Sequence, residues 1–439
     1  MYIPHSEEER RQILEFLGLK SLEELFSHID PSLLSEPFLE EPKSEEELRA
    51  IFKELSSKNK NLVCFAGFGA YDRIIPSVVW QLLSRGEFLT AYTPYQPEAS
   101  QGTLQAIFEY QTLICELTGM EVANASMYDG ASALAEAVLM SRAIRGKGSR
   151  VVLSEGIHPY YKQVVKTYLL GYQDEIRIIP LNKEGTTDLQ LLEEALKDKE
   201  AHALAVQQPN FMGYIENLED ISKLAKAYEV PLVVVADPIA LSVLKPPGEY
   251  GADIVVGEGQ SLGVPLHFGG PYAGFFATKM EHVRKMPGRL VGMAEDIEGN
   301  RAFALVLQTR EQHIRRERAT SNICTNQNLI ALANLIYMVL LGKEGLRDVA
   351  RQSLSKAMYL KKKLLEVGFE EVYSGKHLWE FPLRHKKAKE LYKKALEEGF
   401  LAGVLLENFG YENTILFCAT EKRRKEEIDR LFHVWKAFQ

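Results

Sequence analysis

Short apolar runs alternate with amphipathic, helix-like stretches from Met120 to about Thr278. The apolar runs predict buried strands at 122–125, 150–153, 176–181, 203–207, 232–236, 254–256 and 273–277. The stretches between them predict helices at 130–144 and at about 159–170, 188–198 and 217–228. This alternation is typical of an α/β fold in which helices cover both faces of a mostly parallel sheet. Ligands of such sheets bind at the carboxyl ends of the strands.

The flanking segments have a different pattern. Residues 1–60 are acidic and helix-like, with possible capping boxes at Ser6 with Glu9, Ser21 with Glu24 and Ser44 with Glu47. A long helical stretch covers 329–341 and, past Gly345, 346–367, and short strands and helices follow it. We therefore expect three parts. They are an N-terminal helical arm (1–60), a large α/β domain (61–325), and a linker helix with a smaller C-terminal α/β domain (326–439).

The composition is that of an ordinary globular protein, with 46% hydrophobic and 26% charged residues among 439. A net charge of −8 disfavours non-specific binding to nucleic acid. The four cysteines are far apart, and the ten histidines lack metal-ligand spacing, so neither a disulfide nor a metal site is expected. The acidic N-terminus does not resemble a targeting peptide, and no apolar run reaches the length of a membrane span. We expect a cytoplasmic protein.

Two neighbouring strand ends carry candidate chemistry. Asp237 follows the strand 232–236, and a small-residue loop, Gly257–Phe275, follows the strand 254–256. Many enzymes that use pyridoxal 5′-phosphate (PLP) place an Asp against the pyridine nitrogen and a Schiff-base lysine on a later loop. This chain has no lysine between Lys245 and Lys279. The sequence therefore predicts the floor of a PLP site without its covalent anchor.

Three further segments allow a functional and a structural interpretation. The stretch 66–72 lacks the third glycine of a dinucleotide fingerprint and is better explained as a tight turn. The stretch 126–133 joins a strand to a helix start and offers N–H groups to a phosphate, but Asp129 favours an N-cap instead. His158 at the next helix start is more typical of a structural residue.

Two surface segments are also notable. The loop 91–102 contains two prolines, two tyrosines and a carboxylate, which is typical of either a rigid packed turn or a preset polar loop at a binding site. The helix expected at 386–398 is rich in lysine, which indicates a solvated face or, less often, a docking patch for an acidic partner.

Several stretches together resemble the P-protein of the glycine cleavage system, glycine dehydrogenase (decarboxylating), and within that family subunit 1 of the two-subunit bacterial form. The stretches are Tyr2-Ile3-Pro4-His5, Phe68-Gly69-Ala70-Tyr71-Asp72, Thr93-Pro94-Tyr95-Gln96-Pro97-Glu98, Lys245-Pro246-Pro247-Gly248, Phe268-Gly269-Gly270-Pro271, Gln308-Thr309-Arg310-Glu311-Gln312-His313-Ile314-Arg315-Arg316-Glu317 and Thr320-Ser321-Asn322-Ile323-Cys324-Thr325. They extend over nearly the whole chain. No single one would suffice, but their combination is specific.

The resemblance implies a fold-type I PLP-dependent transferase-like architecture and a pair with subunit 2, expected as a heterotetramer. In subunit 2 the Schiff-base lysine lies five residues before a proline, and the same count back from Pro265 reaches Gln260. An amide cannot form an imine, so PLP is expected on the partner and not on this chain. The implied reaction of glycine catabolism decarboxylates glycine and passes the aminomethyl group to the lipoyl arm of the H-protein. This chain alone is not expected to be active.

The resemblance also suggests which residues contribute to the partner's active site, since fold-type I dimers build each site at their interface. Thr320, Ser321 and Asn322 are candidates to donate hydrogen bonds to the PLP phosphate. Tyr95 and Glu98, with Tyr92 nearby, are candidates to line the entry for glycine or the lipoyl arm. Asp237 is expected to be a relic or structural.

Two other functions remain open at this point. The chain could be an autonomous PLP enzyme that uses another lysine, of which Lys279 is the nearest to the loop. It could also be a non-catalytic scaffold or binding module that kept the PLP-transferase fold. A borohydride-sensitive visible band in the chain alone would favour the first. Mutations at Thr320 or Tyr95 without effect on glycine decarboxylation would favour the second.

Overall fold

The computed structural model describes residues 5–35 and 39–438. The chain divides into two compact units, Met1–Lys60 and Asn61–Gln439, and each is described by itself. The motif residues Tyr2, Ile3 and Pro4 lie outside the described residues. The boundary expected inside the second unit, between 325 and 326, stays a prediction.

The described residues of the first unit, 5–35 and 39–60, contain two α-helices, α1 (Glu7–Leu17) and α2 (Glu45–Ser57). The capping boxes at Ser6 and Ser44 are confirmed, because each serine hydroxyl accepts the N–H three residues later and the glutamate there accepts the serine N–H. The box expected at Ser21 is wrong. The segment that follows is a 3-10 turn, Glu23–Phe26, with no side-chain cap. Neither helix has a buried residue.

The second unit is organised around a seven-stranded sheet with the order β2-β8-β7-β6-β5-β3-β4. Its strands are β2 (Val122–Ala123), β3 (Arg150–Ser154), β4 (Glu175–Ile179), β5 (Ala201–Gln208), β6 (Leu232–Ala236), β7 (Ile254–Glu258) and β8 (Gly274–Thr278). The strands β7, β6, β5, β3 and β4 are parallel, whereas β8 is antiparallel to both of its neighbours. The predicted mostly parallel sheet is confirmed.

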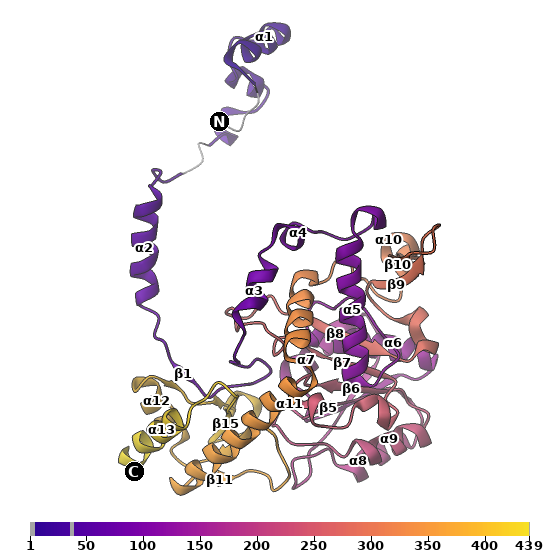
Figure 1. Ribbon diagram of the computed structural model, residues 1–439, viewed down its shortest axis with the longest axis vertical. Helices are drawn as coiled ribbons and strands as arrows, with labels where there is room; N and C mark the ends of the chain where they lie inside the picture. The colour runs from indigo at the N-terminus through magenta and orange to yellow at the C-terminus, as the bar shows by residue number, and fades with distance from the viewer. Residues whose placement is uncertain (1–4, 36–38, 439) are drawn as a thin grey trace. The chain divides into compact units, whose positions relative to one another are not determined.

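Helices cover both faces of this sheet (Figure 1). Along β6, Leu232 and Val234 belong to one buried cluster and Val233 and Val235 to the other, as the two-residue period of a strand requires. One face packs on α6 (Gly130–Arg145) and α7 (Pro159–Tyr168). The other face packs on α5, α8, α9 and the first part of α11. These helices span Gln101–Thr118, Leu189–Leu196, Leu218–Ala227 and Asn328–Glu366.

Polar side chains cap the N-termini of α8 and α9. The Asp188 side chain accepts the N–H groups of Gln190 and Leu191, and Asn217 accepts that of Asp220. Each cap satisfies donors that the first turn of a helix leaves unpaired. The caps fix where these two helices begin, and so the lengths of the loops that precede them.

The helix α11 is long and apolar enough to cross a membrane by length and composition alone. However, it breaks at Gly342, whose φ of 59° and ψ of −173° are not helical. Its first part packs against α5 and α3 (Ser77–Leu83), and 44% of its most apolar window is buried. This packing is that of a core helix. The interruption expected near Gly345 is present, at Gly342.

A smaller four-stranded sheet follows α11, with the order β11-β12-β15-β14. Its elements are β11 (Glu370–Glu371), β12 (Glu380–Arg384), β14 (Val404–Leu405) and β15 (Thr414–Cys418), with α12 (Ala388–Glu397) and α13 (Lys425–Phe438). The segment β1 (Val63–Cys64) pairs in parallel with β13 (Phe400–Leu401). The start of the second unit is thereby hydrogen-bonded to its C-terminal part.

The polar stretch 295–318 contains secondary structure that its sequence pattern does not predict. Within it and just before it, β9 (Leu290–Glu295) and β10 (Arg301–Val306) form an antiparallel hairpin. The short helix α10 (Gln312–Arg315) follows, and α4 (Gly86–Leu89) was also not foreseen. The hairpin packs on α5, where Phe303 joins Leu104 and Ile107 in a separate small core.

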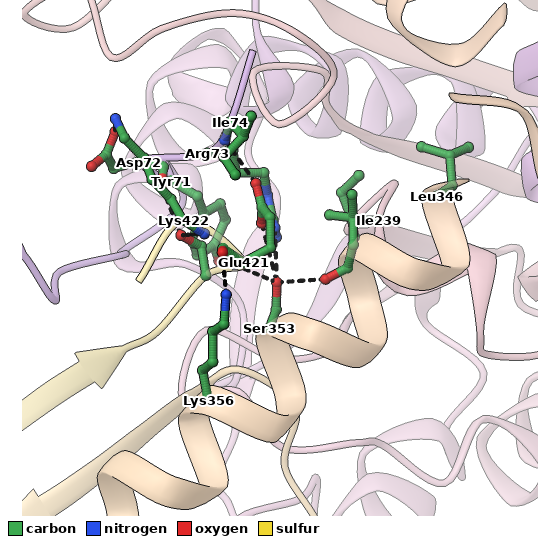
Figure 2. A network of polar contacts seen from close by, with 12 residues as sticks. Tyr71, Asp72, Arg73, Ile74, Ile239, Leu346, Ser353, Lys356, Glu421 and Lys422 are labelled. Atoms are coloured by element: carbon green, nitrogen blue, oxygen red, sulfur yellow. Dashed lines mark hydrogen bonds and ion pairs between the residues drawn. The ribbon is translucent and has the colours of Figure 1, made fainter. Parts of the chain in front are cut away.

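A buried ion pair joins the segment after β1 to the loop before α13 (Figure 2). The guanidinium of Arg73 lies 2.7 Å from the Glu421 carboxylate, with side chains 1% and 4% exposed. Ser353 of α11 contacts both, and Glu421 also accepts the N–H of Ile74 at 2.7 Å. Asp72 pairs nearby with Lys422 and Arg423. Three segments far apart in the sequence therefore meet at one buried charge pair.

Replacing Glu421 by Ala is expected to lower the free energy of unfolding by about 3–5 kcal/mol, because it leaves the Arg73 charge buried without its nearest carboxylate. The double variant Arg73→Met/Glu421→Leu should lose much less than the sum of the two single variants. Glu398→Ala, which breaks an exposed pair with Lys394, is the control and should leave the denaturation curve nearly unchanged. Equal midpoints for Glu421→Ala and Glu398→Ala in urea would contradict the assignment.

Candidate functional site

A small cavity lies at the carboxyl ends of β5, β6 and β7, where an open α/β sheet places its ligand. Its volume is about 40 Å³, enough for a few water molecules. The lining residues are Gly69, Tyr71, His158, Tyr161, Gln207, Val235, Ala236, Asp237, Pro238, Glu258 and Ser261. The two predicted strand ends, at Asp237 and after Val256, therefore do meet.

Asp237 holds the backbone that follows β6. One of its carboxylate oxygens accepts the N–H groups of Ile239 and Ala240 at 2.8 and 3.0 Å. Burial raises the pKa of Asp237, and the nearby charge of Arg73 opposes that rise. A carboxylate committed to capping its own turn has a structural role, which agrees with the expectation from the sequence.

His158 is held in a neutral form at the start of α7. Burial lowers its pKa to about 4. Its Nδ1 accepts the N–H of Tyr160 at 3.2 Å, so Nε2 carries the proton and donates to the carbonyl of Phe68 at 3.2 Å. The ring also packs edge-on against Phe68. The structural interpretation of this histidine is supported, since both ring nitrogens serve the backbone.

Gln260 is buried, and each polar group of its amide has a partner. Its oxygen accepts the N–H of Tyr71 at 2.8 Å, and its NH₂ donates to the carbonyls of Tyr71 and Val264 at 3.0 and 2.7 Å. The amide therefore ties the loop after β7 to the loop after β1. An amide so fully engaged has neither the nucleophilic nitrogen nor the freedom that imine formation needs.

Glu258 was not identified from the sequence, yet it occupies the centre of this strand end. Its Oε2 accepts the N–H of Gly130 at 2.9 Å, and its Oε1 accepts those of Gln260 and Ala273, each at 3.2 Å. Burial raises its pKa to about 7, although the backbone donors oppose the rise. The feature of the sequence that could have pointed to Glu258 is a carboxylate between two glycines at the end of an apolar run.

The helix start at Gly130 is built around this contact. A Cβ at Gly130 would lie 2.3 Å from the Tyr161 hydroxyl and 3.1 Å from Cβ of Glu258, so only glycine fits. Asp129 caps α6 by accepting the N–H of Ser132 at 2.7 Å. The N-cap interpretation of 126–133 is thus confirmed.

PLP does not fit this cavity. Small-molecule sites typically measure about 300–1,000 Å³, many times the space present. The helix start that could hold a phosphate already holds the Glu258 carboxylate. Lys279 follows β8, which runs antiparallel to β7. It therefore lies at the amino end of β7, opposite the end that borders the cavity, and pairs with Asp253. The lysine nearest to the loop in sequence therefore cannot reach the cavity.

The loop 91–98 lies on the surface and is held by a buried arginine. Arg289, just before β9, donates to the Tyr95 hydroxyl at 3.0 Å and faces Asn326 at 3.5 Å. Glu311 lies 3.7 Å from the same guanidinium. Tyr92 is exposed at the rim of a separate cavity of about 290 Å³, which 325–330 also line. Glu98 is exposed in a 3-10 turn, Pro97–Ala99.

The other predicted site residues lie elsewhere on the second unit. Thr320 is exposed and lines a cavity of about 330 Å³ with residues from the end of α6. Ser321 accepts the N–H of Ile323 at 3.1 Å and hydrogen-bonds to Glu136, whose pKa burial raises to about 7. Asn322 is exposed. The structure thus places Tyr92 and Thr320 in two different cavities.

Sequence reasoning missed Arg289 and Glu311, the buried residues behind Tyr95, although Glu311 lies in one of the motifs that carry the resemblance. Both are more than nine-tenths buried, and Nε of Arg289 and Oε1 of Glu311 have no hydrogen-bond partner in the described chain. Among the described residues, no group of His, Cys, Asp and Glu could hold a metal ion.

Comparisons with known proteins agree with one another. The family model described as glycine cleavage system P-protein matches residues 1–435. A protein of Aquifex aeolicus named "Probable glycine dehydrogenase (decarboxylating) subunit 1" is 70% identical over 432 residues, covering 98% of each chain. A crystal structure of glycine decarboxylase (P-protein) in inhibitor-bound form matches with a TM-score of 0.91 and 45% identity over 100% of both chains.

A more distant solved structure, a sphingosine-1-phosphate lyase of Burkholderia pseudomallei, has a TM-score of 0.66. It is 15% identical, and the match covers 94% of this chain and 93% of that one. A likeness at this level of identity shows the fold alone. The fold is that of fold-type I PLP-dependent enzymes, as the resemblance implied.

The Glu258 carboxyl should make stability depend on pH. Its pKa is about 7 in the folded chain against 4.5 as the ordinary value, so between these the folded state binds the additional proton. Its contribution to stability is therefore complete below about pH 4.5 and is lost as pH rises to about 7, a change on the order of 3 kcal/mol.

Glu258→Gln is expected to remove this part of the pH dependence. The measurement is the unfolding free energy from pH 5 to 8 in wild type and variant. Exposed Glu193, changed to Gln, serves as the control and should leave the wild-type profile intact. If the Glu258→Gln profile keeps the wild-type slope, the carboxyl does not titrate in this range.

Proposed function

The chain belongs to the glycine cleavage system P-protein family, and we propose that it is the subunit of a two-chain glycine decarboxylase that carries no cofactor anchor of its own. The name of the Aquifex relative, subunit 1, implies a second subunit. In this proposal subunit 2 holds PLP, which supplies the electron sink for decarboxylation. The aminomethyl group then passes to the lipoyl arm of the H-protein.

The observation that carries the proposal is the state of Gln260. It stands at the position where the resemblance expects a lysine, and its amide is consumed by three hydrogen bonds to backbone. The cavity beside it is too small for the cofactor, and its anion position is taken by Glu258. A chain of this family with such a site needs a lysine-bearing partner to react with glycine.

The side chains that this chain would offer to the partner are on its surface and not in its cavity. Tyr92, Tyr95 and Glu98 lie on one proline-rich loop, where fixed backbone angles limit the entropy lost on association. We assign this loop to the entry for glycine or the lipoyl arm. The Tyr95 hydroxyl accepts a hydrogen bond from buried Arg289, so its own proton remains free to be donated outward.

Thr320, Ser321 and Asn322 are assigned to the partner's cofactor phosphate. Thr320 and Asn322 are exposed, and their side chains can donate hydrogen bonds to an anion. Ser321 is turned toward Glu136 and orders the turn before Ile323. In this proposal Ser321 positions the other two. The complex is assigned to the cytoplasm as a pair of heterodimers.

Co-expression with a lysine-bearing subunit 2 is expected to give glycine-dependent exchange of labelled bicarbonate, whereas either chain alone gives less than about 1% of that rate. The reason is that only the pair contains both the imine-forming amine and the surface loops assigned above. Purification of the pair with a tag on one chain provides the readout of association. Exchange at the full rate by this chain alone would refute the proposal.

Tyr95→Phe is expected to lower kcat/KM of the mixed complex roughly tenfold, because it removes one hydrogen-bond donor and leaves Nη2 of Arg289 without the Tyr95 acceptor. The matched control is Tyr228→Phe. Tyr228 precedes β6 in the chain and lies at the amino end of that strand, away from the cavity, where its hydroxyl donates to Glu193. That variant should keep wild-type activity. Equal activity of both variants would remove Tyr95 from the site.

A further inference from the structure

The first turn of α6 has the properties of an anion site. An N-terminal helix end presents unpaired N–H groups and the positive end of the helix dipole, which favour phosphates and carboxylates. In this chain the N–H of Gly130 points to Oε2 of Glu258 at 2.9 Å. The second oxygen of that carboxylate accepts from Gln260 and Ala273. Three backbone donors from three segments thus converge on a single side chain.

The position of this carboxylate matters because of its neighbours. Glu258 lines the same cavity as Asp237 and His158 and is two residues from Gln260. A phosphorylated pyridine aldehyde lying between Asp237 and residue 260 would need donors for its phosphate, and the Gly130 N–H at the start of α6 is linked to this cavity through the Glu258 carboxylate. Asp129 is turned toward Ser132 and does not cover the Gly130 N–H. Glu258 alone covers it.

We propose that Glu258 is the specificity-determining residue that excludes phosphorylated cofactors from this chain's own cavity, because its carboxylate stands in for the phosphate at the start of α6. Two features keep the cofactor out of the cavity. One is the absence of a lysine at position 260, and the other is the Glu258 carboxylate at the position of the phosphate. Changing Gln260 to Lys therefore restores the amine but not the binding site. Both positions must change before the cavity accepts PLP.

Inorganic phosphate tests the anion position directly. In Glu258→Ser the carboxylate is gone and a short hydroxyl remains, so phosphate should stabilise this variant by about 2–4 °C in Tm at saturating concentration. Wild type should not respond beyond a sodium chloride control of equal ionic strength. Glu258→Gln keeps the shape of the side chain and fills the space, so it should also not respond. These measurements use the full chain at pH 8.

The change in Tm with phosphate distinguishes the possible results. A phosphate response confined to Glu258→Ser supports the proposal. A response of equal size in wild type, or none in Glu258→Ser, overturns it. If Glu258→Ser does not fold in chloride buffer, refolding in phosphate and in chloride is compared. Recovery in phosphate alone then supports the proposal, and failure in both overturns it.

The second test uses PLP itself. The lysine amine of Gln260→Lys would condense with the aldehyde and release water, and borohydride would reduce that imine to a stable secondary amine. Peptide mass spectrometry then locates the adduct at residue 260 and separates it from labelling of surface lysines. Pyridoxal, which lacks the phosphate, is the matched probe.

The double variant Glu258→Ser/Gln260→Lys is expected to carry at least tenfold more PLP adduct at residue 260 than Gln260→Lys, and to prefer PLP to pyridoxal. Gln260→Lys alone should show no such preference. If the single variant takes up PLP as well as the double variant does, Glu258 does not exclude the cofactor. The inference concerns this chain alone, so it is decided independently of whether a mixed complex is active.

Discussion

Buried polar groups must be paired, and at the end of β7 this requirement fixes the positions of three loops. Glu258 collects N–H groups from the start of α6, from its own loop and from Ala273 before β8. Two residues later Gln260 fastens the same loop to Tyr71. An unpaired group here would cost about 1–3 kcal/mol. The strand end is therefore rigid because its charges and amides are satisfied by backbone, with no ligand required.

This satisfied strand end continues into the C-terminal sheet. The Tyr71 hydroxyl donates to Glu380 of β12 at 2.8 Å, and the N–H of Phe68 donates to the same carboxyl at 2.6 Å. Burial raises the pKa of Glu380 to about 7. Two residues beyond Tyr71, Arg73 forms the buried pair with Glu421. The segment 68–73 therefore connects the loop beside the cavity to the small C-terminal sheet through hydrogen bonds and an ion pair.

Local signals allowed much of the fold to be predicted from the sequence. The strand 232–236 was found with its exact bounds because both faces of it are buried, which gives a continuous apolar run. The capping boxes at Ser6 and Ser44 were found because their partners are three residues away. The hairpin β9–β10 was missed because its strands are only partly buried and a polar turn, 296–300, joins them.

The site was only partly predictable, since its contacts join residues far apart in the sequence. The loss of the lysine at Gln260 can be seen in the sequence, whereas the pairing of Glu258 with Gly130 crosses 128 positions. The contact of Arg289 with Tyr95 crosses 194.

Polar side chains are paired differently around the closed cavity and behind the loop 91–98. Around the closed cavity, the polar atoms of Glu258 and Gln260 are paired, and one oxygen of Asp237 caps its own turn. Behind Tyr95, Nε of Arg289 and Oε1 of Glu311 are buried without hydrogen-bond partners in the described chain, although the two side chains form an ion pair at 3.7 Å. Unsatisfied buried groups are costly, and each needs an explanation such as a bound water, an ion or a functional role. The cavity that this chain would use alone is therefore held closed by its own hydrogen bonds, whereas Tyr95 rests on a buried ion pair whose hydrogen-bonding capacity is not filled.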